Sequence, residues 1–239
     1  MLHGYMTQVT PEEVIEHQRE VYNKIATYFS ETRQKPWRDL IFIKTFAEHA
    51  NTVIDIGCGN GRVYQLFSDL SIRYIGIDQS ETQIAIAREK VPHGEFLLAE
   101  MCDIPLKDNL ADLVVCIAVF HHLPDEGHRL QALSEMRRIT KPGAHIIMTN
   151  WNLESDWAHE KISDQEWQPA PDGENSFLVP WKKQDGTVVG QRYYHGFTCD
   201  ELEGLVKKSG LQLHEQYYIK DGARSDKENG DNIVTIMVR

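Results

Sequence analysis

The chain has 239 residues and a formal charge of −11, from 25 Lys and Arg against 36 Asp and Glu. This length suits one domain and is too short for two full enzymatic domains, and a composition of 41% hydrophobic and 26% charged residues excludes a disordered or fibrous protein. The acidic balance argues against generic binding to polyanions, and the absence of an apolar run of about 18 residues argues against a membrane span.

The compartment and the metal content follow from a few residue types. The first residues, MLHGYMTQVTPEEV, lack a basic stretch followed by an apolar one, so a secretory signal is not expected. The four cysteines form no CxxC pair, which indicates reduced thiols in a cytoplasmic protein. Among eleven histidines only His121 and His122 are adjacent, and no protein-bound metal is predicted.

The first 150 residues show a helical start followed by strand–helix alternation. Apolar residues at helical spacing predict a helix over 11–29, and a second helix is expected over 37–49. Ser80 suits a helix N-cap, and the run 141–143 (KPG) suits a helix stop. Apolar runs predict strands, and the segments between them predict helices: strands at 52–57, 73–78, 95–100, 111–119 and 144–150, and helices at 60–69, 80–91 and 126–139.

The strand–helix alternation ends after Trp151. Residues 151–190 are rich in Trp, Pro, Asp and Gly, which indicates an insertion or lid rather than a second domain. A helix over 198–209 and strands over 212–219 and 233–238 close the chain, joined by a charged loop over 220–232 that we expect to be mobile. Continuous apolar strands alternating with helices predict an α/β fold with a doubly wound, mostly parallel sheet of seven strands.

We expect one domain over 1–239 with four parts. An N-terminal helical cap spans 1–50, and a ligand-binding core spans 51–150. An insertion with a strand on the substrate side spans 151–197, and a closing helix with two strands spans 198–239.

The strongest motif is DIGCGNG at residues 55–61, directly after an apolar strand. Its glycines allow a sharp turn and a close approach of backbone N–H groups to a ligand at a helix N-terminus. Nicotinamide, flavin and S-adenosylmethionine sites all use such a loop, so the glycines alone do not choose among them.

Acidic residues at successive strand ends narrow that choice. Asp55 precedes the first glycine, and Asp78, followed by Gln79, ends the next strand, where a carboxylate can accept from both ribose hydroxyls. Asp103 and Ile104 follow the third strand, where they can accept from an adenine amino group and cover its ring. Several acids suit a cationic sulfonium and would repel a pyrophosphate. A glycine turn without ligand and a dinucleotide site remain the alternatives.

These residues resemble the class I S-adenosylmethionine-dependent methyltransferases, which have a Rossmann-like fold. The resemblance covers about residues 50–150 and the two closing strands. It implies that Asp55 orders the methionine amino group, that Asp78 holds the ribose and that Asp103 with Ile104 holds the adenine. It further implies close backbone contact along residues 57–59 (Gly57, Cys58 and Gly59) and, at the sulfonium end, around Ala118.

Two further segments resemble one family of methyltransferases. Residues 28–37 (YFSETRQKPW) and 192–197 (RYYHGF), the latter followed by Glu201-Leu202, are similar to segments of the tRNA wobble-uridine enzymes that esterify 5-carboxymethyluridine. The closing residues 231–234 (DNIV) also match that family. The resemblance implies a tRNA acceptor and, because eukaryotic members have one, a small zinc-binding activator subunit as a candidate partner.

The chemistry of such a reaction agrees with the residue types present. A carboxylate titrates near about 4, is ionised at pH 7 and needs no strong base; the enzyme must align it, hold it with cations and stack the flipped base on aromatic rings. Candidates for positioning the acceptor are Arg33, Arg192, Tyr193 and His195. Candidates for binding it are Arg33, Lys35, Trp37, His121, Trp151, Arg192 and Tyr193.

Simpler interpretations stay open for each of these residues. Arg33 also suits a pair with Glu31, and Trp37 suits packing. Only one of Tyr193 and its neighbour Tyr194 can face a ligand if the segment is a strand. Basic residues at 182–183 suit either a phosphate-facing rim or an ordinary solvated loop. The alternative functions are a small-molecule O- or carboxyl methyltransferase, which the −11 charge favours, and a cofactor-binding protein without transfer activity.

Overall fold

The computed structural model describes residues 9–172 and 175–239. The first eight residues of the predicted N-terminal cap, and residues 173–174 of the predicted insertion, lie outside the described residues. No helix in the described part of the chain is long and apolar enough to cross a membrane.

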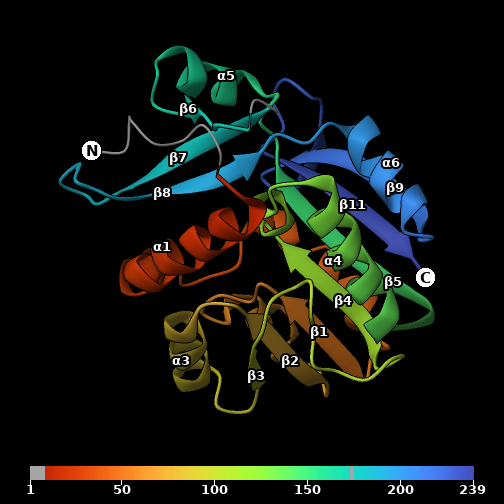
Figure 1. Cartoon of the computed structure of the whole chain (residues 1–239). Helices are drawn as coiled ribbons and strands as arrows, with labels where there is room; N and C mark the ends of the chain where they lie inside the picture. The colour runs from red at the N-terminus through yellow and green to blue at the C-terminus, as the bar shows by residue number, and fades with distance from the viewer. Residues whose placement is uncertain (1–8, 173–174) are drawn as a thin grey trace.

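The main sheet confirms the predicted doubly wound α/β fold (Figure 1). Its strand order is β10-β9-β11-β5-β4-β1-β2-β3. The five strands from β3 to β5 run parallel, and β11 pairs antiparallel with both β5 and β9. The strands are β1 (Thr52–Ile56), β2 (Arg73–Asp78), β3 (Glu95–Leu98), β4 (Ala111–Ile117), β5 (Thr140–Trp151), β9 (Gln212–Lys220), β10 (Ala223–Ser225) and β11 (Asn232–Val238).

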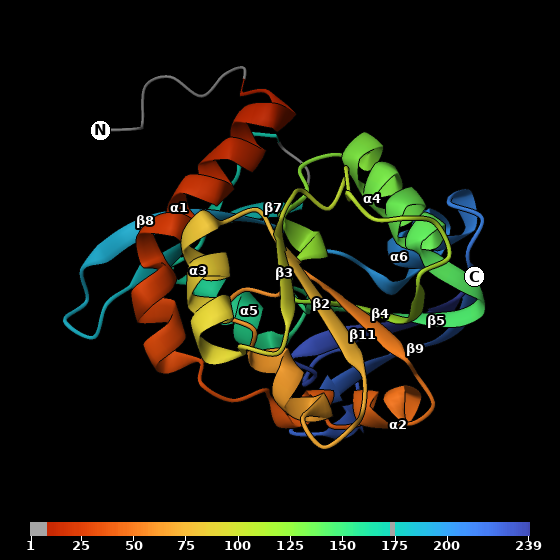
Figure 2. The same cartoon turned by 90° about the horizontal axis from the view of Figure 1, so that it is seen from below.

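Side-chain alternation along the buried strands builds a core on each face of this sheet. Ile54 and Ile56 of β1 pack in a cluster with residues of α4 and α6, whereas Val53 packs in one with residues of α2, η2 and α3. Figure 2 shows α3 and α4 on opposite sides of the parallel strands. The helices are α1 (Pro11–Thr32), η1 (Arg38–Leu40), α2 (Ile43–Ala47), η2 (Arg62–Phe67), α3 (Glu81–Lys90), η3 (Phe120–His122), α4 (Glu126–Ile139), α5 (Asp156–Ser163) and α6 (Cys199–Lys208).

Helix α1 lies between the main sheet and the insertion (Figures 1 and 2). It begins with a capping box, in which Thr10 accepts from the Glu13 backbone N–H and the Glu13 side chain accepts from the Thr10 N–H, with Pro11 at the first position. Its apolar face packs on strand β8 at Gly190, where a Cβ would meet Val21 at 2.9 Å. Close contact with β8 therefore holds α1 across the carboxyl ends of the parallel strands.

The insertion is more regular than its composition suggests. After α5, the strands β6 (Gln168–Pro169), β7 (Ser176–Lys182) and β8 (Val188–His195) form a small antiparallel sheet. Trp167 packs there with Leu153 and Val179, so part of the tryptophan content of the insertion forms a small core of its own.

Three details differ from the sequence expectation. The main sheet has eight strands within the described residues rather than seven, because the loop predicted as mobile contributes the short β10, which pairs with the end of β9. The helix predicted over 60–69 is the 3₁₀ segment η2, and the helix predicted over 37–49 is divided into η1 and α2.

Candidate active site

A long cavity lies at the carboxyl ends of the parallel strands, where the order reverses between β1 and β4. Open α/β sheets bind ligands at this switch point. The empty space of the cavity, including its mouth, is about 1240 Å³. Loops after β1, β2, β3 and β4 form its floor, and Ile15, Tyr22 and Phe29 of α1 form its roof.

The glycine loop after β1 allows two loops to meet at the switch point. Gly57, Gly59 and Gly61 all have positive φ, at +71°, +53° and +76°, and these values favour glycine. A Cβ on Gly57 would lie 2.3 Å from Val119 in the loop after β4. A Cβ on Gly59 would face free space in the cavity, with its nearest neighbour 3.8 Å away.

The end of β2 presents polar groups to the cavity. The Asp78 carboxylate accepts from the backbone N–H groups of Gly59, at 2.9 Å, and Ser80, at 2.8 Å, which fix its orientation. Burial raises the pKa of this carboxyl. Gln83 of α3 is also buried in the cavity wall, and its amide oxygen and nitrogen have no hydrogen-bond partner among the described residues. Buried polar groups are normally paired, so the Gln83 amide is suited to bind a polar ligand in the cavity.

At the end of β3 the structure puts different residues in the cavity from those predicted. The strand ends at Leu98, two residues earlier than expected, and the wall is formed by Glu100 and Met101. Glu100 forms an ion pair with Arg19 of α1. Asp103 is exposed and Ile104 is packed in the core, and neither lines the cavity.

Asp55 lies behind the glycine loop rather than in the cavity wall. One carboxylate oxygen accepts from the Tyr74 hydroxyl, and the other has no partner in the described part of the chain. Burial raises the pKa of Asp55 to about 7, although the Tyr74 hydrogen bond acts in the opposite direction.

Three arginines gather at the other half of the cavity. Arg33, Arg62 and Arg192 line it, and within residues 9–172 and 175–239 none of them forms an ion pair with a carboxylate. Burial, followed by repulsion from Arg33, lowers the pKa of Arg62 to about 10. Burial, followed by repulsion from Arg192, also lowers the pKa of Arg33. Buried charges are normally paired, so this half of the site suits an anionic ligand.

Aromatic rings surround these cations. The Arg62 guanidinium lies 4.4 Å from the Trp37 ring centroid, and the Arg192 guanidinium lies 5.1 Å from that of Tyr194. Trp151 stands beside Tyr194, with ring centroids 4.8 Å apart, and both line the cavity. The Arg192 side chain donates to the Tyr194 hydroxyl at 2.7 Å, but its buried Nε has no partner in the described structure.

The two histidines after β4 are buried and held by neighbours. His122 lines the cavity, with Nδ1 2.7 Å from the Tyr193 carbonyl and Nε2 2.9 Å from the Tyr22 hydroxyl. Burial lowers the pKa of His122 to about 3 and lowers that of His121 as well. His121 stacks on Tyr194 behind the cavity wall, and both imidazoles are neutral at pH 7.

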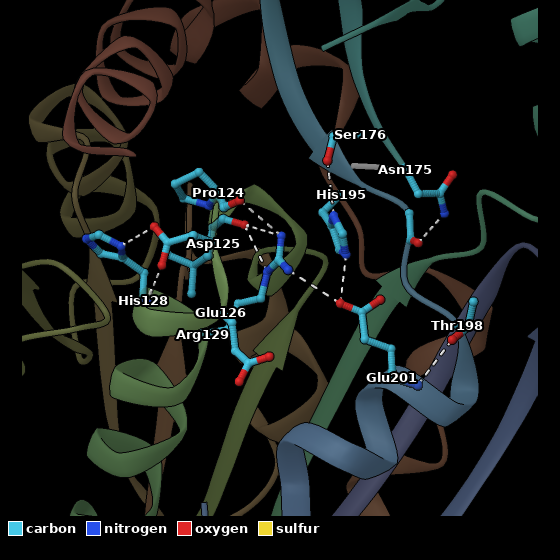
Figure 3. A network of polar contacts seen from close by, with 12 residues as sticks. Pro124, Asp125, Glu126, His128, Arg129, Asn175, Ser176, His195, Thr198 and Glu201 are labelled. Carbon is cyan, nitrogen blue, oxygen red and sulfur yellow. Dashed lines mark hydrogen bonds and ion pairs between the residues drawn. The ribbon is translucent and has the colours of Figure 1, made fainter. Parts of the chain in front are cut away.

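A polar network outside the cavity fixes the loop that follows these histidines (Figure 3). Arg129 donates to the carbonyl oxygens of Leu123 and Pro124, and its Nη1 lies 3.4 Å from Glu201. His195 Nε2 lies 2.8 Å from the same Glu201 oxygen. Because Leu123 lines the cavity, the network links α4, α6 and β8 to one wall of the site.

Ten of the predicted site residues line the cavity: Arg33, Trp37, Gly57, Cys58, Gly59, Asp78, Gln79, Ala118, Trp151 and Arg192. Seven do not: Lys35, Asp55, Asp103, Ile104, His121, Tyr193 and His195. The residues that the predicted set missed include Tyr22, Arg62, Gln83, Glu100, Met101, His122 and Tyr194. A search of the described residues finds no His, Cys, Asp and Glu cluster that could hold a metal ion.

Comparisons with known proteins agree with this geometry. Residues 54–148 match the "Methyltransferase domain" family. The chain is 31% identical to a Schizosaccharomyces pombe tRNA (carboxymethyluridine(34)-5-O)-methyltransferase, over 86% of this chain and 93% of the relative. It is 32% identical to the mouse enzyme of that name, ALKBH8, over 61% of this chain but only 21% of that longer protein.

A solved structure shows the same fold. A Haloferax volcanii methyltransferase, determined in complex with the Trm112 methyltransferase activator, aligns with a TM-score of 0.65 and 18% identity, over 92% of this chain and 96% of the other.

Proposed function

The chain belongs to the S-adenosylmethionine-dependent methyltransferases, and from this premise we propose that it esterifies the carboxylate of 5-carboxymethyluridine at the tRNA wobble position. The observation that carries the proposal is the group of three arginines in the cavity that form no ion pair with any described carboxylate. We further propose that residues 1–239 act as one domain, with the cofactor over 51–150 and the acceptor between α1 and the insertion.

The residues at the strand ends fit S-adenosylmethionine. The Gly59 position leaves free space toward the cavity, Asp78 can accept from ribose hydroxyls, and the unpaired Gln83 amide offers a donor and an acceptor. Glu100 and Met101 take the adenine role first assigned to Asp103 and Ile104. When bound, the cofactor would supply a methyl group on a positively charged sulfur, and an ionised oxygen could attack the methyl carbon while the sulfur leaves as a neutral thioether.

The arginines fit two anionic groups. Arg62 follows the glycine loop directly, in a position from which it could bind the carboxylate of the cofactor. Arg192 comes from β8 beside Trp151, which places it, with Arg33, for the carboxylate of the acceptor. Guanidinium pairs well with carboxylate through parallel hydrogen bonds, and the Trp151 and Tyr194 rings offer surfaces on which a flipped base stacks.

The protonation of the site suits an acceptor that is already ionised. His122, with its lowered pKa and two engaged nitrogens, is not available as a general base near pH 7. A carboxylate acceptor needs none, because the arginines hold it and α1 excludes water from the roof. A neutral hydroxyl acceptor would need a base in place of these cations.

The test compares three synthetic anticodon stem–loops that differ only at the wobble base. One carries 5-carboxymethyluridine, one the neutral 5-carbamoylmethyluridine and one plain uridine. After incubation with S-adenosylmethionine, with and without a Trm112-type activator, nucleoside mass spectrometry should show one added methyl group on the carboxymethyl base alone. The activator is included because the Haloferax relative was solved with one.

Substitution at Arg192 separates binding of the acceptor from folding. Arg192→Met should lower kcat/KM by about 10- to 100-fold, the value of a lost hydrogen bond to a charged group, while the exposed Arg137→Met on α4 serves as the matched control. Methylation of a small carboxylic acid but of none of the three RNAs would favour the small-molecule alternative, and an unchanged rate in Arg192→Met would contradict the assigned role.

A further inference from the structure

A second groove adjoins the cavity on the far side of the arginines. It lies between the end of α1 and the β7–β8 hairpin, and its walls share Arg33 and Arg192 with the cavity. Trp181 forms the wall between these cations, with its ring 4.8 Å from the Arg33 guanidinium and 5.1 Å from that of Arg192. The cavity and the groove are therefore neighbours that share Arg33 and Arg192 in their walls.

The groove carries positive charge on an acidic protein. Its lining holds four cationic residues, Arg33, Lys182, Lys183 and Arg192, against two acids, Glu31 and Asp185, a local balance of 4 − 2 = +2 where the whole chain has −11.

Its cations differ in how far they are neutralised. Lys182 forms an ion pair with Glu166, whereas the Lys183 ammonium lies 4.6 Å from the Tyr28 ring centroid and forms no ion pair with a carboxylate in the described structure. Arg192 is buried, with 6% of its surface exposed, and its Nε has no hydrogen-bond partner in that part of the chain. A buried guanidinium with an unpaired N–H, shared by both hollows, indicates an anion close to both.

We infer that this groove binds the RNA backbone phosphate next to the methylated nucleotide, with Lys183 as its outer contact. The inference rests on the proposed function, because a base inserted in the cavity leaves its ribose and phosphates at the mouth, where the groove begins. The phosphate would supply a negative charge beside cations that form no ion pair with a described carboxylate. Lys and Arg neutralise such phosphates in RNA complexes. The contact is independent of sequence and positions the base.

The experiment measures binding of the 5-carboxymethyluridine stem–loop over a range of KCl concentrations, in the presence of S-adenosylhomocysteine. Lys183→Ala should raise Kd about fivefold, as for one screened charge contact, and should reduce the salt slope by about 0.7. The matched control is Lys207→Ala, an exposed lysine on α6. Equal S-adenosylhomocysteine affinity in both variants shows that they are folded.

A neutral methylphosphonate, placed in turn on either side of the modified uridine, identifies the phosphate. At the contacted position it should weaken binding to the unaltered protein as much as Lys183→Ala does, and it should cause no further loss in that variant. Additive losses at both positions, or equal Kd values for the Lys183 and Lys207 variants, would contradict the proposed phosphate contact in the groove. Neither result would contradict the proposed methyl transfer. Failure of the unaltered protein to methylate the stem–loop would overturn both proposals.

Discussion

The contact between Gly57 and Val119 gives the sharpest test of how the cofactor loop is built. In Gly57→Ala the backbone must keep φ at +71°, which costs an alanine about 1–2 kcal/mol. The new Cβ would also lie 2.3 Å from a Val119 methyl, and forcing extra volume into a packed region adds about 1–3 kcal/mol. Together the substitution should lower the free energy of unfolding by about 2–5 kcal/mol.

Gly61→Ala is the matched control, because Gly61 has a similar φ of +76° but its Cβ would meet nothing closer than 3.3 Å. It should show mainly the backbone cost. The double variant Gly57→Ala/Val119→Ala should be less destabilised than the sum of its single variants, since the colliding methyls are gone.

Urea denaturation of the unaltered protein and the four variants (Gly57→Ala, Gly61→Ala, Val119→Ala and the double variant) measures these differences, and calorimetric titration measures their affinity for S-adenosylmethionine. Equal stability of Gly57→Ala and Gly61→Ala, or strict additivity in the double variant, would refute the close approach of the two loops. Gly59→Ala extends the series, because its Cβ would enter the free space of the cavity. It should keep a stability like that of Gly61→Ala while losing cofactor affinity.

Two further predictions concern the acids. The pKa of Asp55 is raised to about 7 by burial, so the folded protein holds a proton that the unfolded chain loses near 4. Through this group, the free energy of unfolding should therefore fall by about 1.4 kcal/mol per pH unit from pH 4 to 7 and level off above pH 7. Asp55→Asn should remove that pH dependence, as measured by urea titrations at pH 5.5 and 7.5 without ligand. An equal change in stability between these two pH values in both proteins would contradict the prediction. Asp78→Ala should weaken S-adenosylmethionine binding by at least about tenfold in calorimetry, whereas unchanged affinity would exclude Asp78 from the cofactor site.

The sequence could predict several residues that line the proposed cofactor half of the cavity, because local patterns determine their positions. A glycine loop after one strand and an acid at the end of the next are close in the chain, and the parallel sheet brings them together. The family and the fold predicted from these motifs are confirmed. The cavity residues after β3 differ from those predicted because β3 ends at Leu98, two residues earlier than expected, so Glu100 rather than Asp103 lines the cavity.

The proposed acceptor half of the cavity depends on contacts between distant segments, which local patterns do not contain. Alternation in β8 allowed either Tyr193 or Tyr194 to face the ligand, and the structure places Tyr194 in the wall, while the Tyr193 hydroxyl lies 2.6 Å from Asp172. The burial of Arg129 is likewise not visible in the local sequence, because it depends on hydrogen bonds from its guanidinium to backbone carbonyls after η3. No local pattern marked Arg62 as a site residue, since the rings around it come from Phe29 of α1 and from Trp37, the residue before η1.

The measurement that tests the central claim most directly is transfer of a radiolabelled methyl group from S-adenosylmethionine into under-modified bulk tRNA, followed by mild alkali. A methyl ester is cleaved under these conditions, whereas methyl groups on ring carbons, ring nitrogens or ribose oxygens are retained. The proposed function predicts label in tRNA that alkali releases. Label that resists alkali would place the methyl group on another RNA atom, and no label in tRNA despite measurable cofactor binding would contradict the tRNA acceptor.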